Sequence, residues 1–314
     1  NIVAYDVLDS VETAALKTLH EQGLCQVAVD GLHTVHIMDP SHGGESLVPF
    51  PAILVTHAMD KPGLGSQNEH STVATCHRTY SYLKARALGA RIVDARWAID
   101  SQNAGTLLDC DMYKICYDLE SYQDLVEQGS DGAIASASTR NMTIRRESSL
   151  MLSHKLDGIT FGLLRESSFW QNFSEPNDDE GESQLFDPTL RTKLRPMTTP
   201  EIETLLHCWG GRITTVELTE VDILLVDEWM TLDQITRGLE QDLKTHSDVK
   251  RWSIESCKKE ELEDFVQGGT IVGDCGEGVH VRIPIIRTKW LEDSICLNSV
   301  KSMTSYCLGM FIYS

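Results

Sequence analysis

The sequence predicts an α/β protein built from two small three-layer sandwiches in tandem, each with a mainly parallel four-stranded sheet between helices. The length of 314 residues is typical of about two domains. Apolar strands alternate with amphipathic helices in both halves, and this order favours parallel sheets with helices on both faces. One strand–turn–helix pattern also occurs twice, as ARIVDARWAIDSQ (90–102) and IPIIRTKWLEDSI (283–295).

The first repeat is expected to cover residues 1–117, as an N-terminally trimmed and divergent copy. Asp9 or Ser10 can cap its first helix, because a side-chain oxygen there accepts a free backbone N–H. Gly23 ends that helix, since glycine readily adopts the left-handed cap. The expected strands lie at 2–5, 25–29 and 51–57, the expected helices at 11–22 and 77–89, and the final strand and helix within 90–101.

The second repeat is expected to cover residues 156–314, and its helices and strands have clearer boundaries in the sequence. Thr199 can cap a helix that has Pro200 at its first position, where the missing N–H costs nothing. Gly210 and Gly211 stop this helix. The expected strands lie at 156–164, 212–217, 221–227 and 280–286, and the expected helices at 198–209, 232–243, 258–269 and 289–295.

The remaining segments are expected to be a linker and two insertions. Residues 118–155 would join the repeats, with a short helix at 121–127. The second repeat carries an acidic insertion at 165–196, whose stretch SEPNDDEGES (174–183) is expected to be a disordered loop. An extra helical insertion is expected around 244–277.

The doubled pattern has a structural explanation. Trp97 and Trp290 each lie one turn into a final helix that returns to the sheet, where a buried indole contributes a large apolar area. Ser101 and Ser294 follow four residues later on the same helix face and can cap or bond locally. We therefore interpret both tryptophans and both serines as structural residues, together with Gly210 and Gly211.

Composition narrows the classes of function. The formal charge is −20, from 47 acidic and 27 basic residues, so direct binding of nucleic acid is not expected. Two stretches are nevertheless basic, His70–Val93 and Gly132–Leu156, and they could either hold an anion or be solvated surface. No apolar run is long enough to span a bilayer. The nine cysteines lack metal-ligand spacing and are expected to be reduced core thiols of an intracellular protein.

Catalytic motifs are missing from the sequence. The stretch GLGS (63–66) lacks the lysine of a phosphate-binding loop, and GDCGEG (273–278) does not open a helix. Neither HExxH nor GxSxG occurs. The adjacent Cys76 and His77 do not define a catalytic geometry. We expect no enzyme, no cofactor and no metal site.

The pattern of the second repeat resembles the BRCT repeat, named for the breast-cancer protein C-terminus. The resemblance rests on L-x-G-x-x-F (156–161), the Gly-Gly helix end, and I-P-I-I-x-x-x-W-L-x-D-S (283–294). Residues 1–117 match through PAILVTH and RIVDARWAIDS. The segment 77–101 most resembles the first repeat of the checkpoint-mediator adaptors, the fungal DNA-damage mediators and their vertebrate tumour-suppressor-binding relative.

This resemblance implies a tandem module that recognises a phosphoserine peptide, which in the mediators is the phosphorylated tail of a core histone. In that family a Ser or Thr after the first strand, a nearby backbone N–H and a Lys on the second helix hold the phosphate. This chain has Asp6 and Ser81 at the two side-chain positions. The candidate phosphopeptide-binding residues are therefore Ser10, Arg78, Ser81 and Lys84. A phosphate beside Arg78 could gain bidentate hydrogen bonds.

Three functions remain open at this stage. The first is a nuclear, non-enzymatic scaffold in DNA-damage checkpoint signalling, with a phosphorylated peptide and checkpoint kinases or adaptors as partners and no membrane contact. The second is the BRCT portion of a repair enzyme such as a ligase or polymerase. The third is a module that forms a homodimer and has no phosphate site. Phosphopeptide affinity would separate the first function from the third.

Overall fold

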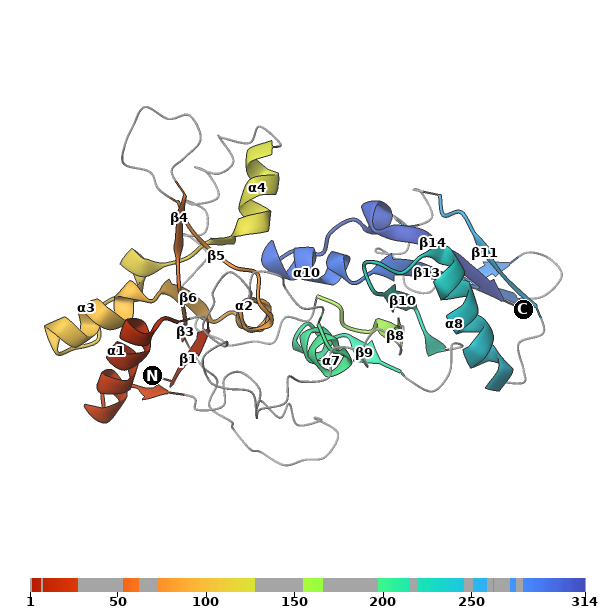
Figure 1. Cartoon of the computed structure of the whole chain (residues 1–314). Helices are drawn as coiled ribbons and strands as arrows, with labels where there is room; N and C mark the ends of the chain where they lie inside the picture. The colour runs from red at the N-terminus through yellow and green to blue at the C-terminus, as the bar shows by residue number, and fades with distance from the viewer. Residues whose placement is uncertain are drawn as a thin grey trace, which may run out of the picture. The chain divides into compact units, whose positions relative to one another are not determined.

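The computed structural model of the chain describes most of both expected repeats (Figure 1). The described residues are 2–6, 8–27, 53–61, 73–127, 155–165, 197–214, 220–245, 251–258, 262, 272–274 and 279–313. The chain divides into two compact units, Asn1–Ser153 with Cys296–Asn298 and His154–Ile295 with Ser299–Ser314. The acidic insertion beyond residue 165 and most of the expected helix 258–269 lie outside the described residues.

The first unit contains the parallel four-stranded sheet that the sequence predicts. Its strand order is β2-β1-β3-β6, and each neighbouring pair is parallel. The strands are β1 (Ile2–Asp6), β2 (Gln26–Val27), β3 (Ile53–Thr56) and β6 (Arg91–Asp94).

Helices cover both faces of this sheet. They are α1 (Ser10–Glu21), α2 (Tyr80–Ala87), α3 (Arg96–Ala104) and the short 3-10 helix η3 (Cys110–Tyr113). Val3, Val55 and Val93 share a core with side chains of α1 and α3. The alternate residues Leu54 and Ile92 are also buried, and α2 contacts β3 and β6. Because successive strand residues face opposite sides, the unit has three layers.

The caps of the first helices differ slightly from expectation. Asp9, and not Ser10, caps α1, because its carboxylate accepts from the backbone N–H of Glu12 at 2.8 Å while Glu12 accepts from the Asp9 N–H at 2.9 Å. Ser10 is the first helical residue. The short helix expected at 121–127 exists as α4 (Leu119–Glu127), within the segment predicted as a linker.

A second, three-stranded sheet in the first unit was not predicted. Its order is β4-β5-β7, with β4 (Met59–Lys61) antiparallel to β5 (Val73–Cys76) and β7 (Tyr117–Asp118) parallel to β5. Strands of two to four residues show no period that a sequence pattern could reveal.

The second unit repeats the parallel core but extends it. β9 (Arg212–Ile213), β8 (Thr160–Leu164), β10 (Ile223–Val226) and β13 (Val279–Arg287) form the parallel part. The four expected parallel strands are present, and three antiparallel strands extend the sheet to seven. The nine-residue β13 is long enough to pair with antiparallel strands beyond the parallel core. The added strands are β11 (Trp252–Glu255), β12 (Val272–Asp274) and β14 (Cys307–Tyr313).

The helices of the second unit largely agree with the sequence. They are α7 (Thr199–Cys208), α8 (Leu232–Thr245), α10 (Lys289–Cys296) and the 3-10 helix η5 (Met303–Ser305). Thr198, one residue earlier than expected, caps α7 through a capping box with Glu201, so Pro200 is the second helical residue. In the segment 244–277, predicted as a helical insertion, the described residues after α8 include the strands β11 and β12.

The doubled tryptophan motif forms the same structure in both units. Trp97 and Trp290 are 1 % and 0 % exposed, so their expected burial is confirmed. Ser101 and Ser294 are fully buried and accept backbone N–H groups from the loop after each helix, both at 3.1 Å. These bonds tie the loop to the helix that precedes it.

The two glycines after α7 serve different purposes. Gly210 has φ 86°, a left-handed conformation that strains residues with a side chain. Gly211 faces a steric limit instead, because a Cβ built on it would lie 2.9 Å from Cε2 of Phe161. Both glycines are therefore required by the fold.

Candidate functional site

The end of β1 meets the start of α2 through a direct hydrogen bond. The Thr79 hydroxyl, which caps α2, donates to Oδ2 of Asp6. The same hydroxyl accepts from the backbone N–H of Tyr82 at 3.1 Å. An acidic side chain therefore lies at the N-terminus of α2, where the helix dipole favours negative charge.

The two candidate hydroxyls lie on the first turns of two helices. Ser10 begins α1 and is exposed. Ser81 is the second residue of α2 and is partly buried. Ser10 comes four residues after Asp6, and Ser81 comes two residues after Thr79, so both hydroxyls lie close to the Asp6–Thr79 contact in sequence. Both N-terminal turns carry backbone N–H groups without intrahelical partners.

Arg78, a candidate phosphate ligand in the sequence, is bound by side chains of the first unit. It precedes α2 and is only 4 % exposed. Its Nε donates to Asp118 Oδ1 at 3.0 Å and its Nη2 donates to the Ser121 hydroxyl at 3.1 Å. A third contact, at 3.1 Å, joins Nη1 to the Glu120 carboxylate. The guanidinium thus anchors the start of α4.

Asp118 is the buried partner of this arginine. Burial alone would raise the pKa of Asp118, but the Arg78 charge and two hydrogen bonds from Ser121 outweigh burial and lower it. Asp118 is fully buried, so the carboxylate depends on these partners for its charge. The ion pair was not predicted, because the two residues are 40 positions apart in the chain.

Lys84 is also buried, contrary to its expected position beside a ligand. It is 1 % exposed, and its ammonium lies 5.7 Å from the centre of the Tyr80 ring. A cation over an aromatic face is attracted by the ring electrons. Lys84 therefore packs within the first unit.

Cys76, the last residue of β5, is fully buried, and burial, followed by the charges of Asp118 and Asp6, raises the pKa of its thiol.

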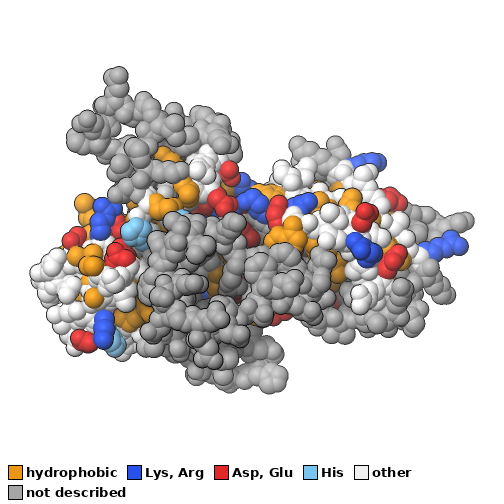
Figure 2. Space-filling view, viewed as in Figure 1, with side chains coloured by type: hydrophobic (Ala, Val, Ile, Leu, Met, Phe, Trp, Pro, Cys, Tyr) orange, Lys and Arg blue, Asp and Glu red, His pale blue; other side chains and the backbone are white. Residues whose placement is uncertain are grey.

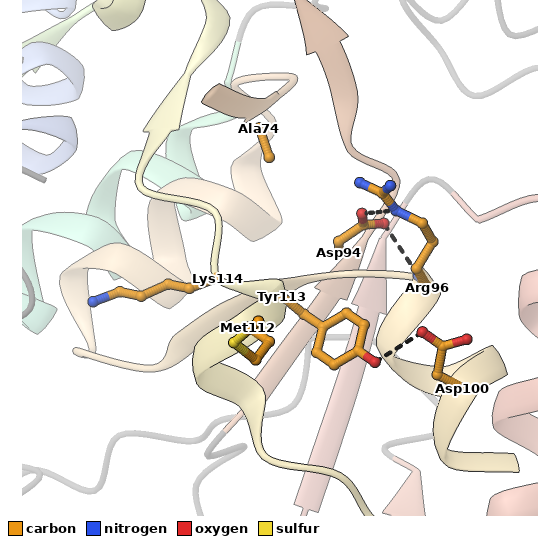
Figure 3. A pocket seen from close by; sticks show the side chains of 7 residues that line it. All are labelled: Ala74, Asp94, Arg96, Asp100, Met112, Tyr113 and Lys114. Carbon is orange, nitrogen blue, oxygen red and sulfur yellow. Dashed lines mark hydrogen bonds and ion pairs between the residues drawn. The ribbon is translucent and has the colours of Figure 1, made fainter. Parts of the chain in front are cut away.

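A separate pocket of about 210 Å³ lies at the carboxyl end of β6, between α3 and η3 (Figure 3). Asp94 and Arg96 form an ion pair on one side of it. The Tyr113 hydroxyl donates to Asp100 Oδ2 at 2.8 Å. Its lining residues are Ala74, Asp94, Arg96, Asp100, Met112, Tyr113 and Lys114. Sequence patterns could not reveal it, because its side chains come from four separate elements.

The second unit has an ion pair at the corresponding edge of its sheet. Arg165 follows β8 and Asp227 follows β10, and the arginine Nη2 lies 2.8 Å from Asp227 Oδ1. Arg165 Nη1 also donates to the Thr199 hydroxyl, at the start of α7, at 3.2 Å. Arg165 and Asp227 are largely buried. These contacts join the ends of β8 and β10 to the start of α7.

The described surface has mixed character. Acidic, basic and hydrophobic side chains are interspersed on the face shown in Figure 2. Among the residues that the structure describes, no three His, Cys, Asp or Glu side chains gather as metal ligands. In that same part of the chain, no helix is long and apolar enough to cross a membrane.

Fold and site together define a class of protein: two successive α/β sandwich units, each with a helix that is anchored by a buried tryptophan. Among solved structures, the chain is similar to the BRCT5-BRCT6 domains of S. pombe Brc1, with 13 % identity, a TM-score of 0.39 and coverage of 96 % of this chain and 94 % of that one. It is also similar to Rtt107p in its complex with a phosphorylated histone, with 9 % identity, a TM-score of 0.42 and coverage of 98 % and 92 %.

S. pombe Rad4 BRCT1,2 in complex with a Crb2 phosphopeptide is a third similar structure, with 12 % identity, a TM-score of 0.22 and coverage of 98 % and 96 %. No family profile matches the chain, and no curated protein does. Identities and TM-scores this low carry no ligand or partner over to this chain.

Proposed function

We propose that the chain is a tandem BRCT-type module that acts as a non-enzymatic, phospho-dependent interaction scaffold. Its partner would be the phosphorylated tail of a chromatin or checkpoint protein, and its setting would be DNA-damage checkpoint signalling in the nucleus. The proposal combines the doubled α/β unit with the sequence resemblance to the checkpoint-mediator adaptors.

The observation that supports this proposal most is the contact between Asp6 and Thr79. It joins the end of the first strand to the N-terminus of α2, the two places from which the resemblance expects phosphate ligands. Ser10 and Ser81 lie close to this contact in sequence, and the backbone N–H groups at a helix N-terminus suit an anion. In this proposal the hydroxyls of Ser10 and Ser81 meet the phosphate.

In this proposal Arg78 and Lys84 do not contact the phosphate directly. Arg78 is a positioning residue, because its contacts to Asp118 and Ser121 fix the segment that leads into α2. Lys84 is held within the unit against Tyr80. Asp6 repels a phosphate, so the affinity is expected to be modest.

A titration of the chain with phosphorylated and unphosphorylated histone-tail peptides tests the proposal. We expect the phosphorylated peptide to bind more tightly, and Ser81→Ala to weaken it. The matched control is Ser299→Ala, an exposed serine in the second unit. Equal affinity for both peptides would favour a dimerisation module without a phosphate site.

A further inference from the structure

The pocket in Figure 3 has the size of a single side chain. Its volume is about 210 Å³, below the roughly 300–1,000 Å³ that is typical of sites for small molecules and cofactors. The pocket lies wholly within the first unit. A protruding side chain of another polypeptide is therefore a better match for it than a free metabolite.

Two carboxylates, Asp94 and Asp100, and two cations, Arg96 and Lys114, line the pocket. Asp94 is 4 % exposed and offsets Arg96, whose Nε and backbone N–H both donate to it. Asp100 has a neutral partner, the Tyr113 hydroxyl. In Figure 3 the Lys114 ammonium extends away from both carboxylates. The hydrogen bond to Asp100, followed by burial, raises the pKa of Tyr113, so the phenol keeps its proton and remains the donor.

Two further side chains suit the stem of a long basic residue. Met112 is 88 % exposed, which is high for a large apolar side chain, and it lies beside the Tyr113 ring in Figure 3. Methylene groups pack well against a thioether, and an aromatic face attracts a cation. An acidic oxygen, an aromatic ring and an apolar wall thus meet in one pocket.

We propose that this pocket binds a lysine or arginine side chain of a basic peptide partner. Asp100 pairs with the cation, while Tyr113 and Met112 contact its methylene stem. The formal charge of −20 favours approach of a basic segment. The pocket uses none of the residues assigned to the phosphate, so its function does not depend on phosphate binding.

The test is a titration of the isotope-labelled full chain, followed by backbone amide chemical shifts. The probe is the capped pentapeptide Gly-Gly-Lys-Gly-Gly, with norleucine or glutamate replacing lysine as comparisons. Amides of Asp100, Met112 and Tyr113 should shift with the lysine peptide and remain unchanged with the glutamate peptide. Norleucine should bind more weakly, since it keeps the stem and lacks the charge.

Two variants distinguish binding in the pocket from attraction by the overall negative charge of the protein. Asp100→Asn should weaken lysine-peptide binding by about two- to fivefold, the range expected for an exposed ion pair. Asp111→Asn is the matched control, because it removes the same charge from an exposed residue of η3 that does not line the pocket. Norleucine binding equal to lysine, or equal effects of the two variants, would overturn the proposal.

Discussion

Trp97 and Trp290 each donate an indole hydrogen bond to the backbone carbonyl eleven residues later, Trp97 to Leu108 at 2.9 Å and Trp290 to Lys301 at 2.8 Å. The N–H of that same later residue donates to a serine seven positions back, Ser101 or Ser294. In each unit the same hydrogen-bonded loop therefore follows the helix that contains the tryptophan. The repeat in the sequence is a repeat of this structure.

Removing either indole should destabilise the unit that contains it. Trp290→Ala should lower the free energy of unfolding by about 3–5 kcal/mol, because it leaves a cavity and frees the Lys301 carbonyl. Urea denaturation followed by circular dichroism measures this loss. Trp229→Ala is the control, since Trp229 is 38 % exposed and should cost clearly less. Equal losses for the two variants would contradict the structural role of Trp290.

Gly211 should be intolerant of a methyl group for a steric reason. Gly211→Ala places a Cβ about 3 Å from the Phe161 ring and should cost about 1–3 kcal/mol, the usual range for overpacking. The double variant Gly211→Ala with Phe161→Leu should show a smaller combined loss than the sum of the single losses. Strict additivity of the two losses in urea denaturation would rule out this contact as the cause.

Arg78 should contribute to stability more than an exposed basic residue does. Arg78→Ala leaves the buried Asp118 carboxylate without its cationic partner and should cost about 3–5 kcal/mol. Lys17→Ala is the control, because Lys17 and its partner Glu21 are both exposed, so its loss leaves no buried carboxylate unpaired. The melting temperature should fall markedly for Arg78→Ala and little for Lys17→Ala. A similar small change for both would show that Arg78 is solvated.

The Asp118 carboxylate should make the free energy of unfolding depend on pH in the acidic range. Its pKa is lowered in the folded state, so its contribution is fully present above the unfolded pKa, about 3.9 for aspartate. That contribution is lost as pH falls through the folded pKa. The stability difference between the wild type and Asp118→Asn should be constant above about pH 5 and shrink below about pH 4. Parallel stability curves down to pH 2 would contradict the lowered pKa.

The sequence predicted those parts of the fold that rest on local periodicity. The four parallel strands of the first unit, α1 and α8 follow apolar patterns that are bounded by caps and glycines. The short strands β4, β5 and β7 were not predicted, because their pairing depends on residues far apart in the chain. β14 was missed as well, and with it the antiparallel extension of the second sheet.

Site residues were harder to predict than elements. Arg78 lies close to Ser81 in the sequence, but the sequence could not show that the Arg78 guanidinium donates a hydrogen bond to Asp118. The direction of a side chain depends on tertiary partners, whereas helix position depends mainly on neighbours in sequence. The bond between Tyr113 and Asp100 likewise joins a 3-10 helix to a neighbouring helix.

The most direct test of the central proposal is a phosphatase experiment on one complex. A fluorescent phosphorylated histone-tail peptide is bound to the full chain, and its anisotropy is followed while phosphatase removes the phosphate. We expect the anisotropy to fall to the value of the free peptide, and the fall to be absent when the phosphatase is inactive. An anisotropy that stays high after complete dephosphorylation would contradict phospho-dependent binding.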